Sequence, residues 1–370
     1  MWWQHGADHE HGGFFEKLGQ DGHSIGRPSR VRVQARQTYV YARAGVLGWP
    51  GPWRAAMNHG LSFMLEHYSR PDGFFRSTLD VADQSIDLYD QAFVLFALAH
   101  AYEAEGRPPE LLLVARSLLR QIDLKLALPD GGYYDGLPAQ PVLKSNPLMH
   151  LLEALLAWVS AGADGDFSKA AVKLCEFAKT RLIHSANGAV GEWFTAGWRP
   201  WATPEVRVYE PGHQFEWSYL LLQAQSLLGI DAIGEAIALE AFGRSFGIDS
   251  TRQVAIFAVN ESGRLIDGRA RLWAQTERLR TSLLFAQVGH GNAATALSAA
   301  AGSFSALGGF LATPVAGLWH EWQDADGQFE PAPAPASSLY HLMTGLGELV
   351  ANPDFHAAGI KLKMRALNIC

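Results

Sequence analysis

A short unit of glycine followed by aromatic side chains recurs along this chain at a nearly constant interval. The unit reads GGFFE, DGFFRS, DGGYYDG and GEWFTAGW, with weaker copies SGRLIDGRARLW and DGQFE. Its marker glycines are separated by 60, 59, 59, 72 and 64 residues, at Gly13, Gly73, Gly132, Gly191, Gly263 and Gly327. A period of this kind, kept over six units, indicates repeated supersecondary units rather than chance similarity among glycine-rich turns.

Each interval contains two segments with a helical pattern. The first pair covers residues 30–47 and 52–68, which end at the sequences GWP and RPDG; glycine and proline are typical helix stops. The later segments are 85–105, 108–125, 147–161, 167–184, 215–228, 231–246, 276–288, 292–304 and 337–351. Several are apolar on more than one face, as in LMHLLEALLAWV, so we expect them to pack on both sides.

Helix pairs that are buried on both sides and joined by short aromatic hairpins predict an all-α fold, an (α/α)6 barrel that forms one domain over residues 1–370. The six inner helices would line the barrel, and the hairpins would cap one mouth. An open α-solenoid is the alternative, but polar side chains at the inner-helix starts favour a closed cup. Because only about a dozen residues precede Gly13, either the C-terminal helix completes the sixth pair or one outer helix is missing.

Composition and charge limit the classes of partner. The net charge is −7 and no basic run occurs, so neither nucleic acid nor an anionic membrane surface is expected. No apolar run approaches the roughly 18 residues that a membrane span needs. The two cysteines, Cys175 and Cys370, are far apart, and the N-terminus shows no signal peptide, which predicts a reducing, cytoplasmic location. We expect a monomer or a homodimer with a small-molecule substrate.

The stretch YEPGHQFEW carries the strongest local indication of chemistry. His213 and Glu216 are three residues apart, on one face of a helix. Pro211 and Gly212 fit a helix start, so His213 would lie on the first turn. The helix dipole favours the neutral imidazole there, which is the form that a proton-abstracting base needs. The alternative is a buried hydrogen-bonded pair that only fixes helix packing.

Further polar side chains lie at the starts of the other candidate inner helices. They are Arg32, Gln34 and Arg36; Asp87, Tyr89 and Asp90; Asn146 and His150; Trp273, Gln275 and Glu277; and His341. Taken singly, each has a structural interpretation, such as a buried ion pair or a core histidine. In a closed barrel, however, the six helix starts meet at one mouth. Three imidazoles, a carboxylate, a guanidinium and an indole would then face one cavity.

Several other site classes are not indicated. His5, His9 and His11 resemble a metal cluster but lack a cysteine or a patterned carboxylate, so we expect no metal and no cofactor. The chain has no P-loop, dinucleotide fingerprint, G-x-S-x-G or C-x-x-C motif. A glycoside hydrolase needs two facing carboxylates. The convergent groups here are mainly imidazoles, which suit proton transfer near neutral pH.

Six motifs together carry a resemblance to a known family. In chain order, GGFFEKLGQDG, RVRVQARQTYVYARAG, SNPLMHLLEA, YEPGHQFEW, RLWAQTE and PASSLYH resemble the N-acylglucosamine 2-epimerase superfamily over almost the whole chain. That superfamily includes mannose isomerases, other aldose–ketose isomerases and cellobiose 2-epimerases. The resemblance implies an (α/α)6 barrel and cofactor-free, metal-free proton transfer at C1 and C2 of a reducing sugar.

The resemblance also implies residue roles. His213 and His341 are similar to the acid/base pair of the family, and Glu216 to the carboxylate that supports the neighbouring His213. Arg36 resembles the residue that holds the sugar oxygens near C1 and C2. The remaining matches are Tyr89, Asn146 and Trp273 as substrate contacts and His150 as the candidate for ring opening.

Two departures within the superfamily bear on the substrate. The Asn-x3-His spacing of Asn146 and His150 resembles the mannose isomerase and cellobiose epimerase branches rather than the animal-type epimerases. The cellobiose branch carries a tryptophan five residues before the last histidine, where this chain has Ala336. Both features favour a free monosaccharide. The short N-terminus also departs from the family.

We therefore expect an aldose–ketose isomerase that converts D-mannose to D-fructose through a cis-enediol. Alternatives are a 2-epimerase acting on glucose and mannose, or on the N-acetylated pair, and less strongly a disaccharide 2-epimerase. A non-catalytic sugar-binding scaffold is a third class. We expect His341 to lie opposite His213 in the ring and to carry the carbon proton, with the pKa of His213 raised by Glu216.

Overall fold

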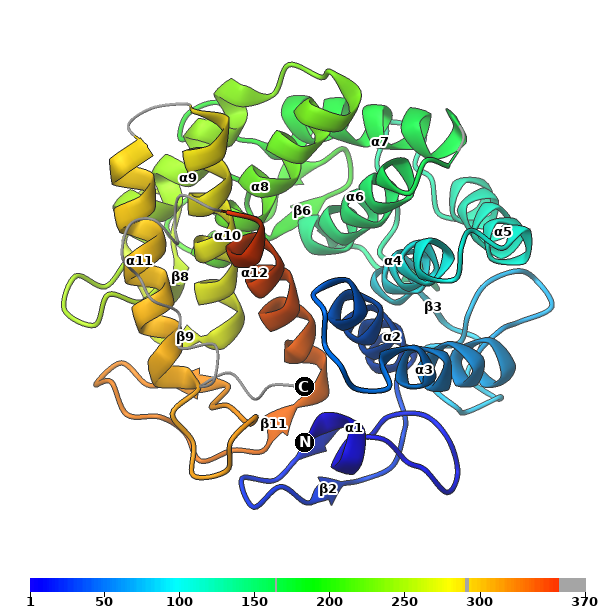
Figure 1. The fold of residues 1–370 in the computed structure, drawn as a ribbon. Helices are drawn as coiled ribbons and strands as arrows, with labels where there is room; N and C mark the ends of the chain where they lie inside the picture. Colours follow the sequence, from blue (N-terminus) through cyan, green and yellow to red (C-terminus); the bar gives the residue numbers. More distant parts are fainter. Residues whose placement is uncertain (164, 290–292, 353–370) are drawn as a thin grey trace.

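Alternating helices form a ring in the computed structural model, which describes residues 1–163, 165–289 and 293–352 (Figure 1). The inner helices are α2 (Val31–Val46), α4 (Leu88–Ala104), α6 (Ser145–Ser160), α8 (Pro211–Leu228), α10 (Leu272–Val288) and α12 (Leu339–Ala351). Outside them lie α3 (Trp53–His67), α5 (Pro109–Lys125), α7 (Gly165–Phe177), α9 (Ile233–Phe246) and α11 (Ala293–Phe310). Each of these packs on the inner helix before it, and α12 contacts both α10 and α2. The predicted (α/α)6 barrel is confirmed.

The N-terminal segment packs against the hairpin that follows α11. A short helix, α1 (Trp2–His5), precedes the first hairpin, and Trp2 stacks on Trp319 with ring centroids 4.8 Å apart. The expected completion of the sixth pair by a C-terminal helix falls on residues 353–370, which lie outside the described residues. Among the helices that are described, none is both long and apolar enough to cross a membrane.

Short antiparallel strands gather at the N-terminal ends of the inner helices. Their order is β11-β1-β2 (Ala334–Pro335, Lys17–Leu18, Ser24–Ile25), β3-β4 (Ile86–Asp87, Gly136–Leu137), β5-β6-β7 (Leu143–Lys144, Trp193–Thr195, Arg199–Pro200) and β10-β9-β8 (Trp322–Gln323, Leu265–Arg271, Ile256–Val259). Strands β3, β5 and β9 run directly into α4, α6 and α10, and β11 reaches α12 through the turn η2 (Ala336–Ser338). The hairpins therefore fix the position along the barrel axis at which these four inner helices begin.

A buried glutamine fastens four of the hairpins to their inner helices. Its amide both accepts from and donates to the backbone of one hairpin residue, at 2.7–2.9 Å. The pairs are Gln34 with Phe14, Gln91 with Phe75, Gln214 with Val190 and Gln275 with Ala255. Each glutamine is fully buried and is the fourth residue of its helix. Gln34 and Gln275, grouped with the candidate site from sequence, thus have a structural role that keeps the repeats in register.

Candidate active site

The inner helices present their second, third and sixth residues to one cavity at the hairpin mouth. Residues about four apart lie on the same helix face. The second and third residues therefore form one level of the cavity wall, and the sixth residues form another, one helical turn deeper. The cavity has a volume of about 140 Å³. It is lined by Arg36, Tyr89, Asn146, His150, Glu210, His213, Glu216, Phe257, Arg271, Trp273, Ser337, Ser338 and His341. All eight side chains that the sequence assigned to the site therefore meet there.

Each of the three imidazoles has a carboxylate at its Nδ1 atom. The distances are 2.9 Å from His213 to Glu192, 3.1 Å from His150 to Glu153 and 2.7 Å from His341 to Glu277. A hydrogen bond at one ring nitrogen fixes the orientation of the imidazole and the proton on that side. All three rings are thus held by Nδ1, which leaves Nε2 of each for chemistry.

His213 is held as a cation. Burial opposes charge on the ring, but the carboxylates of Glu192 and Glu210 raise the pKa of His213 to about 10. The neutral form expected from the helix dipole is therefore wrong. Nε2 of His213 lies 3.3 Å from the side-chain amide nitrogen of Asn146. A rotation of that amide would present its buried, unpaired oxygen to the Nε2 proton instead.

Glu216 does not pair with His213 as the sequence suggested. Its carboxylate lies 3.8 Å from Nδ1 of His150 and 3.5 Å from Arg280. The reason is geometric, because the sixth residue of α8 points one turn deeper into the barrel than the third. The carboxylate that supports His213 comes instead from Glu192 in the hairpin before α8.

His341 has the opposite electrostatic environment. Burial, together with the positive charges of Arg36 and Arg280, holds the pKa of His341 well below its usual range. Burial also raises the pKa of Glu277, against the opposing charge of Arg280. A neutral His341 carries its proton on one ring nitrogen only, and Nδ1 lies within hydrogen-bond distance of Glu277. When that proton lies on Nδ1, Nε2 carries a lone pair and is a base.

His213 and His341 do not lie opposite each other, contrary to the prediction from the sequence. They lie on α8 and α12, which are both neighbours of α10 rather than helices across the ring. The indole of Trp273, on α10, lies between them, with ring centroids 4.9 Å from His213 and 5.6 Å from His341. His213 and His341 therefore flank one aromatic side chain in the cavity wall.

Arg36 is a buried guanidinium that makes no ion pair with any described carboxylate. It donates to the carbonyl of Ser337 at 3.1 Å and to the hydroxyl of Tyr89 at 2.5 Å. Its carbon lies 4.0 Å from the centre of the Phe93 ring, and its Nε atom is buried without a partner. An uncompensated positive charge in a cavity wall is suited to an oxygen that becomes negative during a reaction.

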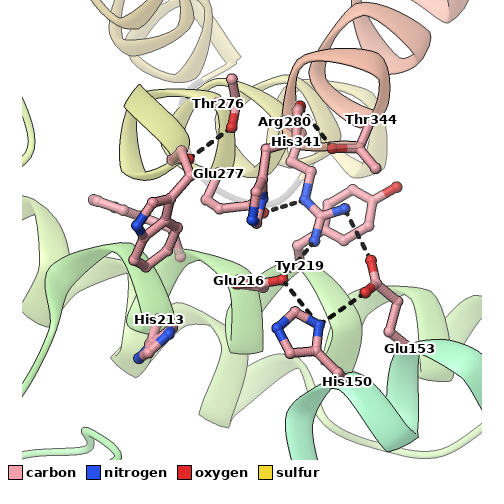
Figure 2. Close-up of polar contacts among 12 residues, drawn as sticks. His150, Glu153, His213, Glu216, Tyr219, Thr276, Glu277, Arg280, His341 and Thr344 are labelled. Atoms are coloured by element: carbon pink, nitrogen blue, oxygen red, sulfur yellow. Dashed lines mark hydrogen bonds and ion pairs between the residues drawn. The ribbon is translucent and has the colours of Figure 1, made fainter. Parts of the chain in front are cut away.

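Beneath the cavity, Arg280 binds three carboxylates at once (Figure 2). It lies 3.4 Å from Glu153 and 3.5 Å from Glu216, and it forms a still closer pair with Glu277. All four side chains are buried. We call Arg280 and these three carboxylates the floor of the cavity. Through Arg280, the floor connects Glu153, the partner of His150, to Glu277, the partner of His341.

Three groups of ligand-type side chains occur among the described residues. They are His150, Glu153 and Glu216; Glu192, Glu210 and His213; and Glu216, Glu277 and His341. The first and third share the charge of Arg280, which already compensates their carboxylates. His5, His9 and His11, which resemble a metal cluster in the sequence but were not expected to bind one, do not belong to these groups.

Sequence reasoning missed Glu192, Glu153 and Arg280. A signal for Glu192 existed, since it follows the marker Gly191 where the first three repeats carry an aromatic residue. Glu153 lies three residues after His150, on the same helix face. Arg280 gave no signal, because a charged residue deep in a helix is usually interpreted as surface.

Three carboxylate-held imidazoles and a buried guanidinium at one mouth of a helical barrel are groups suited to proton transfer. The chain belongs to the N-acylglucosamine 2-epimerase family, whose model (N-acylglucosamine 2-epimerase, GlcNAc 2-epimerase) matches residues 13–345. The expected isomerase or epimerase class is confirmed. The chain is 37% identical over 360 residues to a protein of Rhizobium meliloti named mannose-6-phosphate isomerase, covering 94% of this chain and 92% of that protein.

Other similar proteins carry related names. A D-mannose isomerase of Thermobifida fusca is 29% identical over 273 residues, covering 66% of each chain. The crystal structure of a D-mannose isomerase superposes with a TM-score of 0.82 at 19% identity, covering 94% of this chain and 93% of that one. A cellobiose 2-epimerase from Spirochaeta thermophila gives a TM-score of 0.83 at 19% identity, over 95% and 92% of the two chains. At that identity the two structures support the fold.

Proposed function

We propose that this protein interconverts free D-mannose and D-fructose without a cofactor, through a cis-enediol. One observation carries the proposal: Arg36 and His341 line the same cavity. The guanidinium of Arg36 is buried and makes no ion pair with a described carboxylate. Burial and the positive charge of Arg36 lower the pKa of His341, so that imidazole is neutral. An arginine that binds O1 and O2 would place C2 beside that base. The names of the relatives support the same sugar.

The proton balance follows from the charge states. With the sugar opened, a step we assign to His150, Nε2 of His341 takes the C2 proton while the imidazolium of His213 protonates O1. The Nδ1 proton of His341 can shift to Glu277, so the base gains no net charge. Arg36 stabilises the enediolate. His341 then returns its proton to C1 as the O2 proton goes back to His213, which gives the ketose.

The cavity favours a free sugar over a sugar phosphate, although the Rhizobium meliloti relative is named for the phosphate. Of the two arginines that line it, Arg271 is paired with Glu321, and Arg36 is required at the reacting oxygens. The carboxylate of Glu210 also lines the wall. A phosphate dianion would thus meet no uncommitted arginine at the sugar's far end among these residues.

One assay tests the reaction and the substrate together. The protein is incubated separately with D-mannose and D-mannose 6-phosphate, and the products are identified by NMR. Fructose from mannose, with at least tenfold lower kcat/KM for the phosphate, is the expected result. Preference for the phosphate would overturn the free-sugar assignment, and glucose without fructose would establish the 2-epimerase.

The 2-epimerase is the second candidate because two imidazoles flank Trp273. Epimerisation needs acid/base groups on both faces of C2, and His213 and His341 both line the cavity. Ala336 is fully buried beneath the rim. It therefore offers no surface for a second sugar ring, and we do not favour a disaccharide substrate.

Removing the unpaired guanidinium should cost activity without unfolding the protein. We expect Arg36→Ala to lower kcat/KM at least 100-fold, which corresponds to about 3 kcal/mol of transition-state stabilisation. Because Arg36 has no carboxylate partner, its loss leaves no buried charge unpaired. Arg36→Lys, which keeps the charge but not the fork of donors, should recover part of the rate. Wild-type kinetics in Arg36→Ala would remove this residue from the site.

The alkaline limb of the pH–rate profile should report the charge of His213. If His213 acts as the acid, activity is present below its raised pKa, about 10, and is lost as the pH rises through that value. Glu192→Gln removes the nearest carboxylate and should move this limb down by about 1–3 pH units. Glu261→Gln, in the next hairpin and paired with Arg207, is the control and should leave it in place. An unmoved limb in Glu192→Gln would refute the acid role.

Chelation should not inactivate the enzyme. Arg280 supplies the positive charge that two of the three ligand-type groups would otherwise need from a metal. We therefore expect full turnover of D-mannose after exhaustive dialysis against EDTA. A loss of activity that a divalent ion restores would identify one of the three groups as a metal site.

A further inference from the structure

A second cavity opens at the opposite end of the barrel, where the inner helices finish. Its volume is about 680 Å³, larger than that of the catalytic cavity. Its walls come from the second halves of all six inner helices, with Tyr39 and Arg43 on α2, His100 on α4 and Glu348 on α12. We call it the rear cavity. The proposed reaction uses none of these four side chains.

Three groups in the rear cavity have no partner among the described residues. They are the guanidinium of Arg43, the imidazole of His100 and the hydroxyl of Tyr39. None of the three makes a hydrogen bond or an ion pair with a described residue. The rings of Tyr39 and His100 are in contact, with centroids 4.6 Å apart. Burial and the nearby charge of Arg43 lower the pKa of His100 to about 3. One positive charge thus lies uncompensated beside two neutral hydrogen-bonding groups.

Two of the three carboxylates that line the rear cavity, those of Glu348 and Glu153, are already engaged, and the third, Glu103, is exposed. Glu348 accepts a short hydrogen bond from the hydroxyl of Tyr219, whose own oxygen accepts from Gln223 at 2.6 Å. Glu153 is bound to Arg280 and to His150. Neither carboxylate lies within ion-pair distance of Arg43. Arg43 therefore makes no ion pair with any carboxylate of the described residues, and its charge can meet a ligand.

We propose that the rear cavity binds a small phosphate-class anion, inorganic phosphate or a phosphate monoester, between Arg43, His100 and Tyr39. A guanidinium offers a planar fork of donors that matches phosphate oxygens. The phenol hydroxyl can donate to a third oxygen, and the imidazole can do so once protonated. The cavity volume exceeds that of the ion, which leaves room for an organic substituent.

The position of the guanidinium depends on one glycine. Gly347, on α12, faces Arg43, and a Cβ atom built there would lie 2.6 Å from Nη2 and 2.8 Å from Nε. Any side chain would push the guanidinium away from its place. Because the atoms concerned are the end of a flexible side chain, the shift costs little. Gly347→Ala therefore displaces the charge without removing it.

Occupancy of the rear cavity should be felt in the catalytic cavity. Arg280 and Glu153 both line the rear cavity. Arg280 pairs with Glu277, the partner of His341, and Glu153 is itself the partner of His150. These two charged side chains therefore line the rear cavity and contact residues that line the catalytic cavity. An anion close to Arg280 weakens the field that keeps His341 neutral, so its binding should slow turnover.

Binding is tested by titrating inorganic phosphate and glycerol phosphate at constant ionic strength, followed by calorimetry. We expect Arg43→Gln and Gly347→Ala each to weaken binding at least tenfold. Glu348→Gln should strengthen it, and Arg54→Gln, an exposed arginine on α3, should leave it unchanged. Gly347→Ala should not lower the melting temperature, since alanine favours a helix interior. No saturable binding, or binding unaffected by Arg43→Gln and Gly347→Ala, would overturn the site.

The location is tested by Arg36→Gln. Phosphate binding lost in Arg36→Gln but kept in Arg43→Gln would place the anion in the catalytic cavity and overturn the proposal. The effect of a bound anion on the catalytic cavity, which we call communication, rests on the proposed function. It is tested separately, by measuring D-mannose turnover with and without phosphate. Slower turnover in the wild type but not in Gly347→Ala is expected. Unchanged turnover at saturating phosphate would refute the communication and leave the binding result standing.

Discussion

His341→Asn should abolish exchange of the C2 proton of D-mannose with solvent deuterium, a loss of at least about 1000-fold. The prediction rests on the hydrogen bond between Nδ1 of His341 and Glu277 and on the low pKa that burial and Arg36 impose on the ring. Asparagine can keep the bond to Glu277, so the fold should survive. In the wild type, part of the label should pass from C2 to C1 without exchange, because one shielded base carries the proton.

The contrast with His213→Asn identifies the roles. That variant removes the imidazolium that Glu192 holds, so it should slow turnover while C2 exchange persists at a reduced rate. His320→Asn, outside the cavity, is the control and should have wild-type kinetics. If the C2 proton still exchanged at the wild-type rate in His341→Asn, His213 would be the carbon base and a two-base epimerase would become the better description.

The repeat made the fold predictable from sequence. A marker glycine every 59–72 residues, with two helical segments between markers, already implied a ring of helix pairs. The structure adds the physical reason for that regularity, which is the glutamine at the fourth position of four inner helices. Gln91 and Gln214 looked like ordinary helical residues, because a buried amide that binds a hairpin backbone has no local sequence signature.

Membership of the site was also predictable, whereas the pairing within it was not. The helix starts converge, so Arg36, His213 and His341 could be placed in one cavity without coordinates. Their electrostatics depend on partners far along the chain, such as Glu277, 64 residues before His341. Glu216, three residues after His213, does add to the raised pKa of His213, but its nearest imidazole is that of His150. Spacing along a helix predicts the helix face on which a side chain lies. Which neighbour that side chain contacts depends on its depth in the barrel.

Arg280→Met should be the most destabilising single substitution considered for this protein. Arg280 is the one described guanidinium in contact with Glu153, Glu216 and Glu277, and all four side chains are buried. Removing one partner from a buried ionic cluster leaves charges uncompensated and costs about 3–5 kcal/mol. We expect a loss of that size in the free energy of unfolding, measured by denaturant titration.

The matched control lies two residues earlier on the same helix. Arg278 is also buried, but it donates to the carbonyl of Gln253 at 2.8 Å and makes no ion pair with a described carboxylate. Arg278→Met should therefore cost at least about 2 kcal/mol less than Arg280→Met, since it strands no carboxylate. Adding Glu277→Gln to Arg280→Met should restore part of the stability, because it removes one of the stranded charges. Equal losses for the two arginines, or no recovery in the double variant, would mean that Arg280 does not hold the floor through its charge.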